Sequence, residues 1–328
     1  MMLFFLALAF SCDEKGDDSS DESDADTDTD TDTDTDTDTD PDPATVPLAG
    51  PCPLETRYGG FLVDASVDYT IIDGSVKNGV VPSSVLESIA AEGDCVLLKR
   101  NNPFCDPTCE PDEVCDFDGS CIPNPTNQDL GTVTVDGLTK PVEMEATEET
   151  YNYFDTSLPK GALVPGALVT LQSTGGVYDP ITLYGVGFEL LTAPKAPWSI
   201  DDGKPLTVVW DAPTGSVVRS EAYLKISIDQ HGITPTALYC SFADDGEGTV
   251  PASLLNTLVS AGVTGFPDGS LTRRTVDSTA AGAGCAELVV SSLYDADVNV
   301  VGYTPCTNDK MCPEGQHCNE KLERCEKD

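Results

Sequence analysis

Thirteen cysteines decide much of what this chain of 328 residues can fold into. Twelve of them follow residue 50, and eight of these gather in two short clusters, at 105–121 and 306–325. Such density is typical of exported proteins, because an oxidising compartment converts cysteine pairs into disulfides. Only two histidines accompany the cysteines, which argues against catalysis or metal binding that relies on histidine. The sequence therefore predicts a disulfide-stapled protein from an oxidising compartment.

The two cysteine clusters share one spacing and predict one small module used twice. Five residues separate Cys109 from Cys115, and five separate Cys312 from Cys318. Zinc is the competing interpretation, but the two-residue spacings of zinc sites are absent. Each module resembles a truncated EGF-like unit, which implies that the first cysteine pairs with the third and the second with the fourth. Four cysteines alone allow three connectivities. The implied pairs are Cys105–Cys115, Cys109–Cys121, Cys306–Cys318 and Cys312–Cys325.

Outside the clusters, nearness along the chain predicts a bridge between Cys52 and Cys95, and the two cysteines that remain, Cys240 and Cys285, are able to form a second bridge. All twelve cysteines after residue 50 are then paired, and Cys12 is left over. An odd cysteine in an exported protein needs a role of its own, and lipidation supplies one.

Cys12 closes a short apolar run at residues 3–10, LFFLALAF. Eight residues cannot span a hydrocarbon core, which requires about 20 in a helix, so the run is typical of a secretory signal peptide. Ala9-Phe10-Ser11-Cys12 resembles a bacterial lipobox, in which the cysteine receives a diacylglyceryl thioether. The resemblance implies a signal peptide over 1–12 and a lipid anchor on Cys12. An ordinary cleaved signal, or an apolar terminus without a signal function, is the alternative.

The segment 13–51 predicts a disordered acidic spacer. Residues 13–42 hold 16 acidic residues and one lysine, a charge of −15, and 27–40 are seven Thr-Asp pairs. Such a segment cannot bury enough apolar surface to offset its ordering entropy, and like charges extend it. The whole chain carries −40, so the remainder carries −25. This charge repels phosphate backbones and excludes nucleic acid as a partner.

After the spacer, residues 52–104 predict a small β/α segment. Residues 58–64 and 66–73 have strand composition, and 95–98 return as a strand. Between them, Ser84 and Glu87 form a capping box ahead of an apolar stripe, and Gly93 is a stop, so a helix is expected there.

The Cys-rich modules, 105–125 and 305–328, bracket a β-rich region at 128–304. Its apolar runs alternate with Gly, Pro and Asp turns about every ten residues, the spacing of a sandwich. A single sandwich region and a division into two subdomains, 128–195 and 196–304, are both compatible with this pattern. A helix is expected between Pro251 and Gly262.

One stretch of the β region has a specific likeness. PLTVVWDAP at 205–213 and the strand at 222–230 resemble strands B and C of fibronectin type III domains, with Trp210 in the core. The expected fold class is all-β: an Ig- or fibronectin-III-like sandwich region with small disulfide-rich modules and a disordered acidic N-terminal spacer.

No common catalytic motif is present in the sequence. An Asp229–His231 pair at a strand end is imaginable as a catalytic dyad, but a turn histidine is the commoner case, so no catalytic residue is nominated. Asp201-Asp202-Gly203 and 244–247 (DDGE) are typical hairpin turns.

The second of these turns also raises a metal question. A structural calcium ion on Asp244, Asp245 and Glu247 is the alternative for it. No other cofactor is expected.

The whole layout resembles the predicted lipoproteins of myxobacteria and their relatives. Its lipobox, Thr-Asp spacer, Cys-rich modules, WDAP strand and the segment 239–255 (YCSFADDGEGTVPASLL) carry that resemblance. It implies a non-enzymatic lipoprotein anchored in a bacterial outer membrane or at the cell surface, which contacts an extracellular protein or glycan. The alternatives are an exported glycan hydrolase using paired carboxylates and a structural protein of the envelope or matrix.

Overall fold

The computed structural model describes residues 41–215, 217–229 and 235–327. The predicted lipid anchor Cys12, most of the acidic spacer and His231 lie outside these residues. The described chain is built from strands, with one α-helix, α1 (Ala252–Ala261), where the sequence predicts it. No helix in the described ranges is long and apolar enough to cross a membrane.

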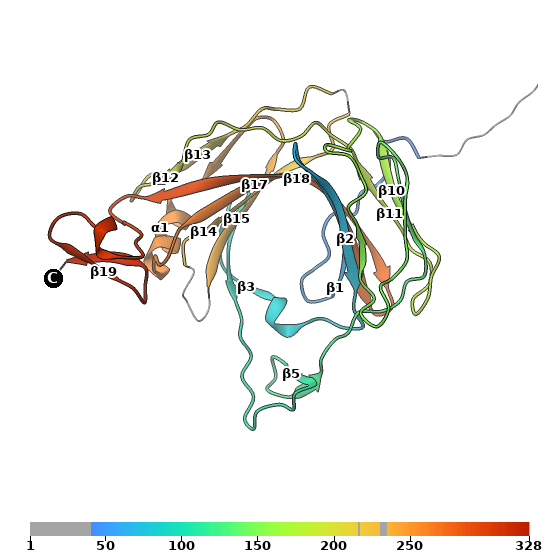
Figure 1. The fold of residues 1–328 in the computed structure, drawn as a ribbon, viewed down its shortest axis with the longest axis horizontal. Helices are drawn as coiled ribbons and strands as arrows, with labels where there is room; N and C mark the ends of the chain where they lie inside the picture. Colours follow the sequence, from blue (N-terminus) through green and yellow to red (C-terminus); the bar gives the residue numbers. More distant parts are fainter. Residues whose placement is uncertain (1–40, 216, 230–234, 328) are drawn as a thin grey trace, which may run out of the picture. The chain divides into compact units, whose positions relative to one another are not determined.

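The largest element is a ten-stranded sheet, in which two long central strands, β17 and β18, are neighbours (Figure 1). Neighbouring strands are antiparallel except where β1 and β12 both run parallel to β18. Its strands, in sheet order, are β3 (Leu86–Glu92), β4 (Cys95–Arg100), β15 (Thr236–Ala243), β14 (Glu221–Ser227), β17 (Asp268–Ala281), β18 (Gly284–Val300), β1 (Arg57–Ala65), β2 (Thr70–Val76) and β9 (Tyr153–Asp155), with β12 (Trp198–Ile200) beside the far end of β18.

Strands β17 and β18 have 14 and 17 residues, so they extend about 50 Å and serve two separate cores. The first core lies between one part of the sheet, including Phe61, Ile72 and Leu288, and a second sheet that carries Leu171 and Leu183. The four strands of that second sheet are β11 (Thr182–Val186), β10 (Leu168–Ser173), β7 (Val133–Asp136) and β8 (Val142–Met144). We call this pair of layers the first sandwich.

The second core covers the other part of the same sheet face. Leu224 and Leu238 of the large sheet pack there with Trp210 and with Leu255 of α1. Opposite the large sheet lie α1 and the paired strands β13 (Leu206–Val209) and β16 (Glu247–Val250). We call this unit the second sandwich. Because β13 and β14 lie in different sheets, as strands B and C do in Ig-type domains, the predicted all-β sandwich fold is confirmed.

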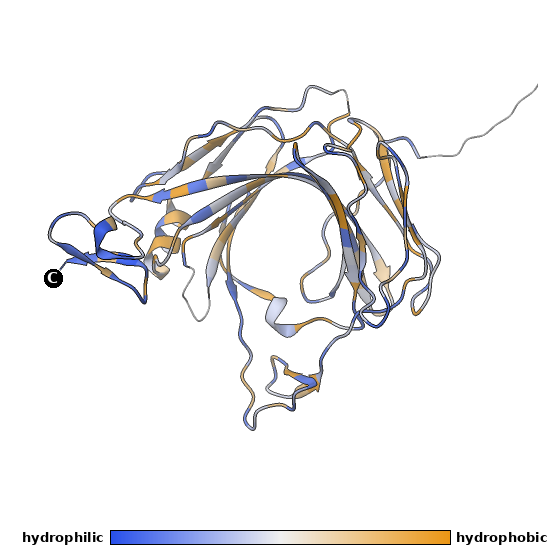
Figure 2. Cartoon of the chain, in the orientation of Figure 1, coloured by the Kyte–Doolittle hydropathy of each residue, from blue (hydrophilic) through white to orange (hydrophobic). Residues whose placement is uncertain are grey.

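Each Cys-rich module is a small hairpin held by two disulfides. Strands β5 (Glu113–Cys115) and β6 (Cys121–Pro123) form the first hairpin, and β19 (Gln316–Asn319) and β20 (Arg324–Lys327) form the second, after the 3-10 turn η2 (Asp309–Met311). The C-terminal module is coloured mostly hydrophilic in Figure 2, since its bridges substitute for an apolar core. The bridges are Cys105–Cys115, Cys109–Cys121, Cys306–Cys318 and Cys312–Cys325, the pairing that the EGF-like resemblance implies.

The other two disulfides differ from the sequence prediction. Cys52 pairs with Cys285 rather than Cys95, and Cys95 pairs with Cys240. Strand pairing explains both bridges: β4 and β15 place Cys95 directly opposite Cys240, and β1 runs along β18 so that Arg57 lies opposite Cys285. Nearness along the chain was therefore the wrong guide, because the partners meet only through long-range sheet register.

The helix expected from Ser84 to Gly93 is also wrong. The chain forms a single 3-10 turn, η1 (Pro82–Ser84), and then the edge strand β3. The hydroxyl of Ser84 donates backwards to the carbonyl of Val81, 2.7 Å away, instead of capping a helix. Backbone pairing with β4 satisfies the polar groups that a helix would have paired internally.

A strap at 41–56 precedes β1 and lies against the folded body. Arg219 holds it by donating to the carbonyls of Pro43, Ala44 and Val46 at 3.3, 2.9 and 2.9 Å. The backbone N–H of Ala49 then donates to Asp277 of β17 (2.8 Å), and the Cys52–Cys285 bridge ties the strap to β18.

Candidate functional site

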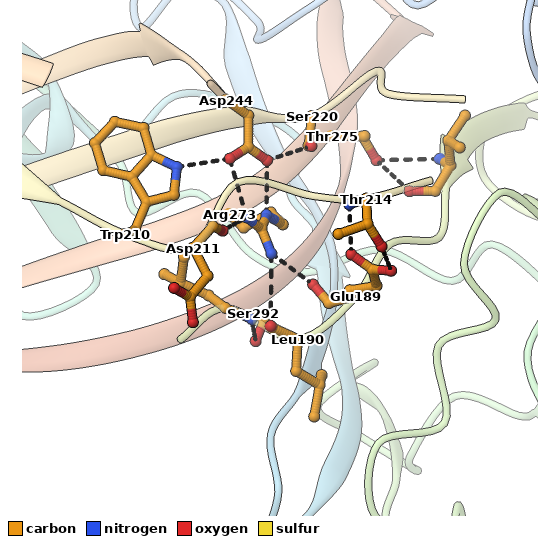
Figure 3. A network of polar contacts seen from close by, with 12 residues as sticks. Glu189, Leu190, Trp210, Asp211, Thr214, Ser220, Asp244, Arg273, Thr275 and Ser292 are labelled. Atoms are coloured by element: carbon orange, nitrogen blue, oxygen red, sulfur yellow. Dashed lines mark hydrogen bonds and ion pairs between the residues drawn. The ribbon is translucent and has the colours of Figure 1, made fainter. Parts of the chain in front are cut away.

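The turn that the sequence offers for calcium contains a buried ion pair instead (Figure 3). Asp244, at the turn between β15 and β16, faces Arg273 of β17 at 2.6 Å, and the two side chains are 0% and 1% exposed. The carboxylate also accepts hydrogen bonds from the indole N–H of Trp210 (2.8 Å) and the hydroxyl of Ser220 (2.6 Å).

All five N–H groups of Arg273 have acceptors. Two go to the Asp244 carboxylate, and three go to the backbone carbonyls of Glu189, Leu190 and Asp211. These carbonyls belong to the segment that joins the two sandwiches and to the end of β13, so the guanidinium ties together chain segments that are distant in sequence. A charge this buried is tolerated only with such complete pairing.

This pairing argues against calcium on Asp244. Each carboxylate oxygen already accepts two hydrogen bonds, and one of the two comes from the guanidinium of Arg273. Asp245 and Glu247 are exposed at the turn. Where the structure describes the chain, the candidate metal clusters consist largely of cysteines, and those cysteines are in disulfides.

The remaining sequence candidates are ordinary surface features. Asp201 pairs with Lys204 across a turn at 2.5 Å, and this hydrogen bond lowers the pKa of Asp201. Asp229 accepts from the hydroxyl of Thr264 at 2.8 Å. The dyad partner proposed for Asp229, His231, is outside the described residues.

A different site lies on the face of the large sheet opposite the two cores, which we call the open face. Along β14, the side chains of Leu224 and Ile226 are buried in the core, and the side chain of Tyr223, between Ala222 and Leu224, points to the opposite face of the sheet. Tyr239 alternates in the same way on β15, and Arg274 on β17. These side chains line a hollow of about 580 Å³, which we call the open-face groove. Its lining also includes Pro51, Cys52, Leu54, Arg57, Leu86, Leu98, Glu221, Ser241, Val276, Glu287 and Val289.

Two tyrosines and an arginine form the floor of the groove. The rings of Tyr223 and Tyr239 stack with centroids 5.9 Å apart, and the guanidinium carbon of Arg274 lies 3.4 Å from the Tyr223 centroid. Glu221, directly across from Arg274 in the sheet, accepts from its Nε at 2.7 Å and also accepts from Ser241. The face and one edge of the guanidinium are therefore fixed, and its two Nη groups make no hydrogen bond to any residue that the structure describes.

A second ion pair lies at the β1 side of the groove. Arg57 donates to Glu287 at 3.2 Å, and the other oxygen of Glu287 accepts from the backbone N–H of Cys52 at 3.1 Å. Arg57 and Glu287 also border a neighbouring hollow of about 430 Å³ that runs over Gly60 and Gly74. The groove thus continues across the open face toward β2.

The tyrosine hydroxyls of the groove are available donors. In the described part of the chain, neither the Tyr223 nor the Tyr239 hydroxyl makes a hydrogen bond, whereas every fully buried side-chain N or O atom does. Both hydroxyls therefore lie at the solvent side of the groove. Burial of the rings raises the pKa of both tyrosines, so the hydroxyls stay protonated at neutral pH.

Sequence analysis missed both polar clusters, although part of the signal was present. Arg273 lies two residues after the buried Leu271 on the same strand, so both side chains point to the core face. A buried arginine there needs a counter-charge. The groove had no comparable signal, because its side chains come from the strap and from seven strands whose order the sequence did not reveal.

No protein-family model matches the chain, and no curated protein matches it. Among solved structures, the chain is similar to the FN1–FN3 domains of chicken CNTN1, with 9% identity, 63% of this chain and 64% of that chain covered, and a TM-score of 0.17. It is also similar to a Ca²⁺-stabilised adhesin of an Antarctic bacterium, with 11% identity, 75% and 72% covered, and a TM-score of 0.17. Scores this low place no constraint on function.

Proposed function

We propose that the protein is an exported lipoprotein, anchored through Cys12, that presents a non-enzymatic binding module outside the membrane. The observation that carries the proposal is the open-face groove, where the unpaired hydroxyls of Tyr223 and Tyr239 and the Nη groups of Arg274 surround an apolar hollow. Pockets that combine an apolar lining with a few convergent polar groups are the usual form of ligand sites.

The scaffold around the groove supports an exported location. Six disulfides hold the described chain, and two of them, Cys52–Cys285 and Cys95–Cys240, staple the strands that border the groove. Such a set of bridges is typical of oxidising compartments. The acidic Thr-Asp segment, up to about 100 Å long at full stretch, is suited to separate the module from a membrane.

A binding role is favoured over hydrolysis because the carboxylates near the sites are already committed. Asp244 is neutralised by Arg273, and Glu221 and Glu287 of the groove are paired with Arg274 and Arg57. A glycosidase needs one free carboxylic acid and one free carboxylate facing each other across the substrate.

Fatty-acid labelling of cells that express the wild type, Cys12→Ala and the neighbouring control Ser11→Ala tests the anchor. We expect label on the wild type and on the control, none on Cys12→Ala, and digestion of the wild type by protease added to intact cells. Equal labelling of the wild type and Cys12→Ala, or no label on either, would overturn the anchor. Full protection of the wild type from external protease would overturn the surface location.

A further inference from the structure

We propose that the open-face groove binds a small organic carboxylate with a flat apolar body, whose carboxylate is held by Arg274 and Arg57 and whose body lies on Tyr223 and Tyr239. This inference rests on the proposed binding function and names the chemical class of its ligand. It is argued from the donors that the groove leaves unused, from its apolar lining and from its size.

The sign of the ligand's charge follows from which polar groups are already paired. Glu221 accepts from Arg274 and Ser241, and Glu287 accepts from Arg57 and from the Cys52 backbone. In the described chain, Arg274 uses only its Nε and Arg57 only one Nη as hydrogen-bond donors. A cation entering the groove therefore meets carboxylates that are already neutralised, whereas an anion meets unused N–H donors.

The guanidinium of Arg274 is held in place before any ligand binds. Its carbon lies 3.4 Å from the centroid of Tyr223, its Nε is fixed by Glu221, and its side chain is only 16% exposed. Its two Nη groups present the planar edge that matches the two oxygens of a carboxylate. Because little side-chain entropy remains to be lost, such a preorganised donor binds more strongly than a mobile surface arginine.

The rest of the groove fits an apolar body. Its lining includes Leu54, Leu86, Leu98, Val276 and Val289 beside the two stacked tyrosine rings. A hollow of about 580 Å³ lies inside the range of small-molecule sites, roughly 300–1,000 Å³. Flat rings stack on tyrosine with offset geometry, so the floor favours a planar body.

The surrounding charge makes this site distinctive. The chain has 17 lysines and arginines against 57 acidic residues. Even so, two arginines, Arg57 and Arg274, line the same groove. A third, Arg100, is close enough to act on Tyr239, because its positive charge opposes the rise in the Tyr239 pKa that burial causes. Since Glu221 and Glu287 balance the two arginines of the groove, the attraction for an anion comes from the unused N–H donors of Arg57 and Arg274 and from the nearby charge of Arg100.

The test is isothermal titration of the purified full chain, disulfides intact, with 2-naphthoate and with the uncharged 2-naphthamide. We expect naphthoate to bind at least tenfold more tightly than naphthamide. Arg274→Gln and Arg57→Gln should each weaken naphthoate binding at least tenfold, and Tyr239→Phe, which removes only a hydroxyl, should weaken it a few-fold. Arg324→Gln, which breaks a comparable ion pair in the C-terminal module, is the matched control and should bind like the wild type.

Three results would overturn the inference: no naphthoate binding at millimolar concentration, equal affinity for the acid and the amide, or wild-type affinity in Arg274→Gln. If Arg274→Gln fails to fold, Arg57→Gln and Tyr239→Phe carry the same test, since the Arg57 side chain is 37% exposed and Tyr239→Phe removes only a hydroxyl at the solvent side of the groove. The titration does not depend on lipidation, so a failed anchor at Cys12 and a failed ligand class give different patterns of results.

Discussion

Replacing Asp244 by leucine should cost about 4 kcal/mol of the free energy of unfolding. The change removes the counter-charge of Arg273 together with the acceptor of the Trp210 indole and the Ser220 hydroxyl. Arg273 keeps its three carbonyl acceptors, but its side chain is 1% exposed, so water cannot replace the lost carboxylate. Breaking a buried pair in this way costs about 3–5 kcal/mol.

The double variant separates the ion pair from the rest of the network. Asp244→Leu with Arg273→Met removes both charges at similar volume, so we expect it to recover about 3 kcal/mol of the loss. A residual cost of about 1 kcal/mol or more should remain, because Trp210 and Ser220 still lack an acceptor and the carbonyls of Glu189, Leu190 and Asp211 lose their donor.

Urea unfolding of the disulfide-bonded protein, followed by tryptophan fluorescence, measures these differences. Asp245→Asn is the matched control, since it changes the adjacent exposed carboxylate and should shift stability by less than about 0.5 kcal/mol. A loss below about 1 kcal/mol for Asp244→Leu, or a double variant as unstable as the sum of the two single variants, would refute the reasoning.

Three further predictions concern other parts of the fold. Removing the Cys52–Cys285 bridge with a pair of serines should lower the unfolding free energy in guanidinium by about 5 kcal/mol, since the bridge spans 233 residues; a loss under about 2 kcal/mol would contradict the loop argument. Burial raises the pKa of Tyr153 to about 12, above its unfolded value of about 10, so its contribution to stability is complete below about pH 10 and is lost toward pH 12. Alkaline unfolding of Tyr153→Phe should show a shallower decline than the wild type, and an identical decline would count against it. Finally, EDTA should leave wild-type stability unchanged, because Asp244 is satisfied by the protein; a clear drop on chelation would restore a calcium site at this turn.

Local patterns in the sequence were enough to predict most of the individual strands and the helix α1. The two-residue alternation of apolar side chains predicted the strand at 222–230 and the burial of Trp210. Pro251 and Gly262 predicted the two ends of α1. The helix predicted from Ser84 failed because capping chemistry is local, whereas the pairing of β3 with β4 is decided by the sheet as a whole.

Long-range features could not be predicted in the same way. The partner of Cys52 lies 233 residues away and meets it only because β1 runs parallel to β18. The groove has the same origin: alternation shows that Tyr223 points away from the core, but nothing local places Tyr239 and Arg274 beside it. The acidic turns that the sequence offers as candidate sites are satisfied by the protein itself, and the structure instead offers a site on a sheet face.

The strap and its disulfide give the module a defined response to mechanical tension. A pull on the chain at Pro41 loads the hydrogen bonds from Arg219 first and the Ala49–Asp277 contact next. The force then reaches Cys52 and passes through a covalent bond into β18, the strand that both sandwiches share. Tension at the N-terminal end is therefore delivered through Cys52 to Cys285 near the start of β18 without peeling β1 away, and because Pro51 and Cys52 also line the groove, the pull acts directly on one side of it.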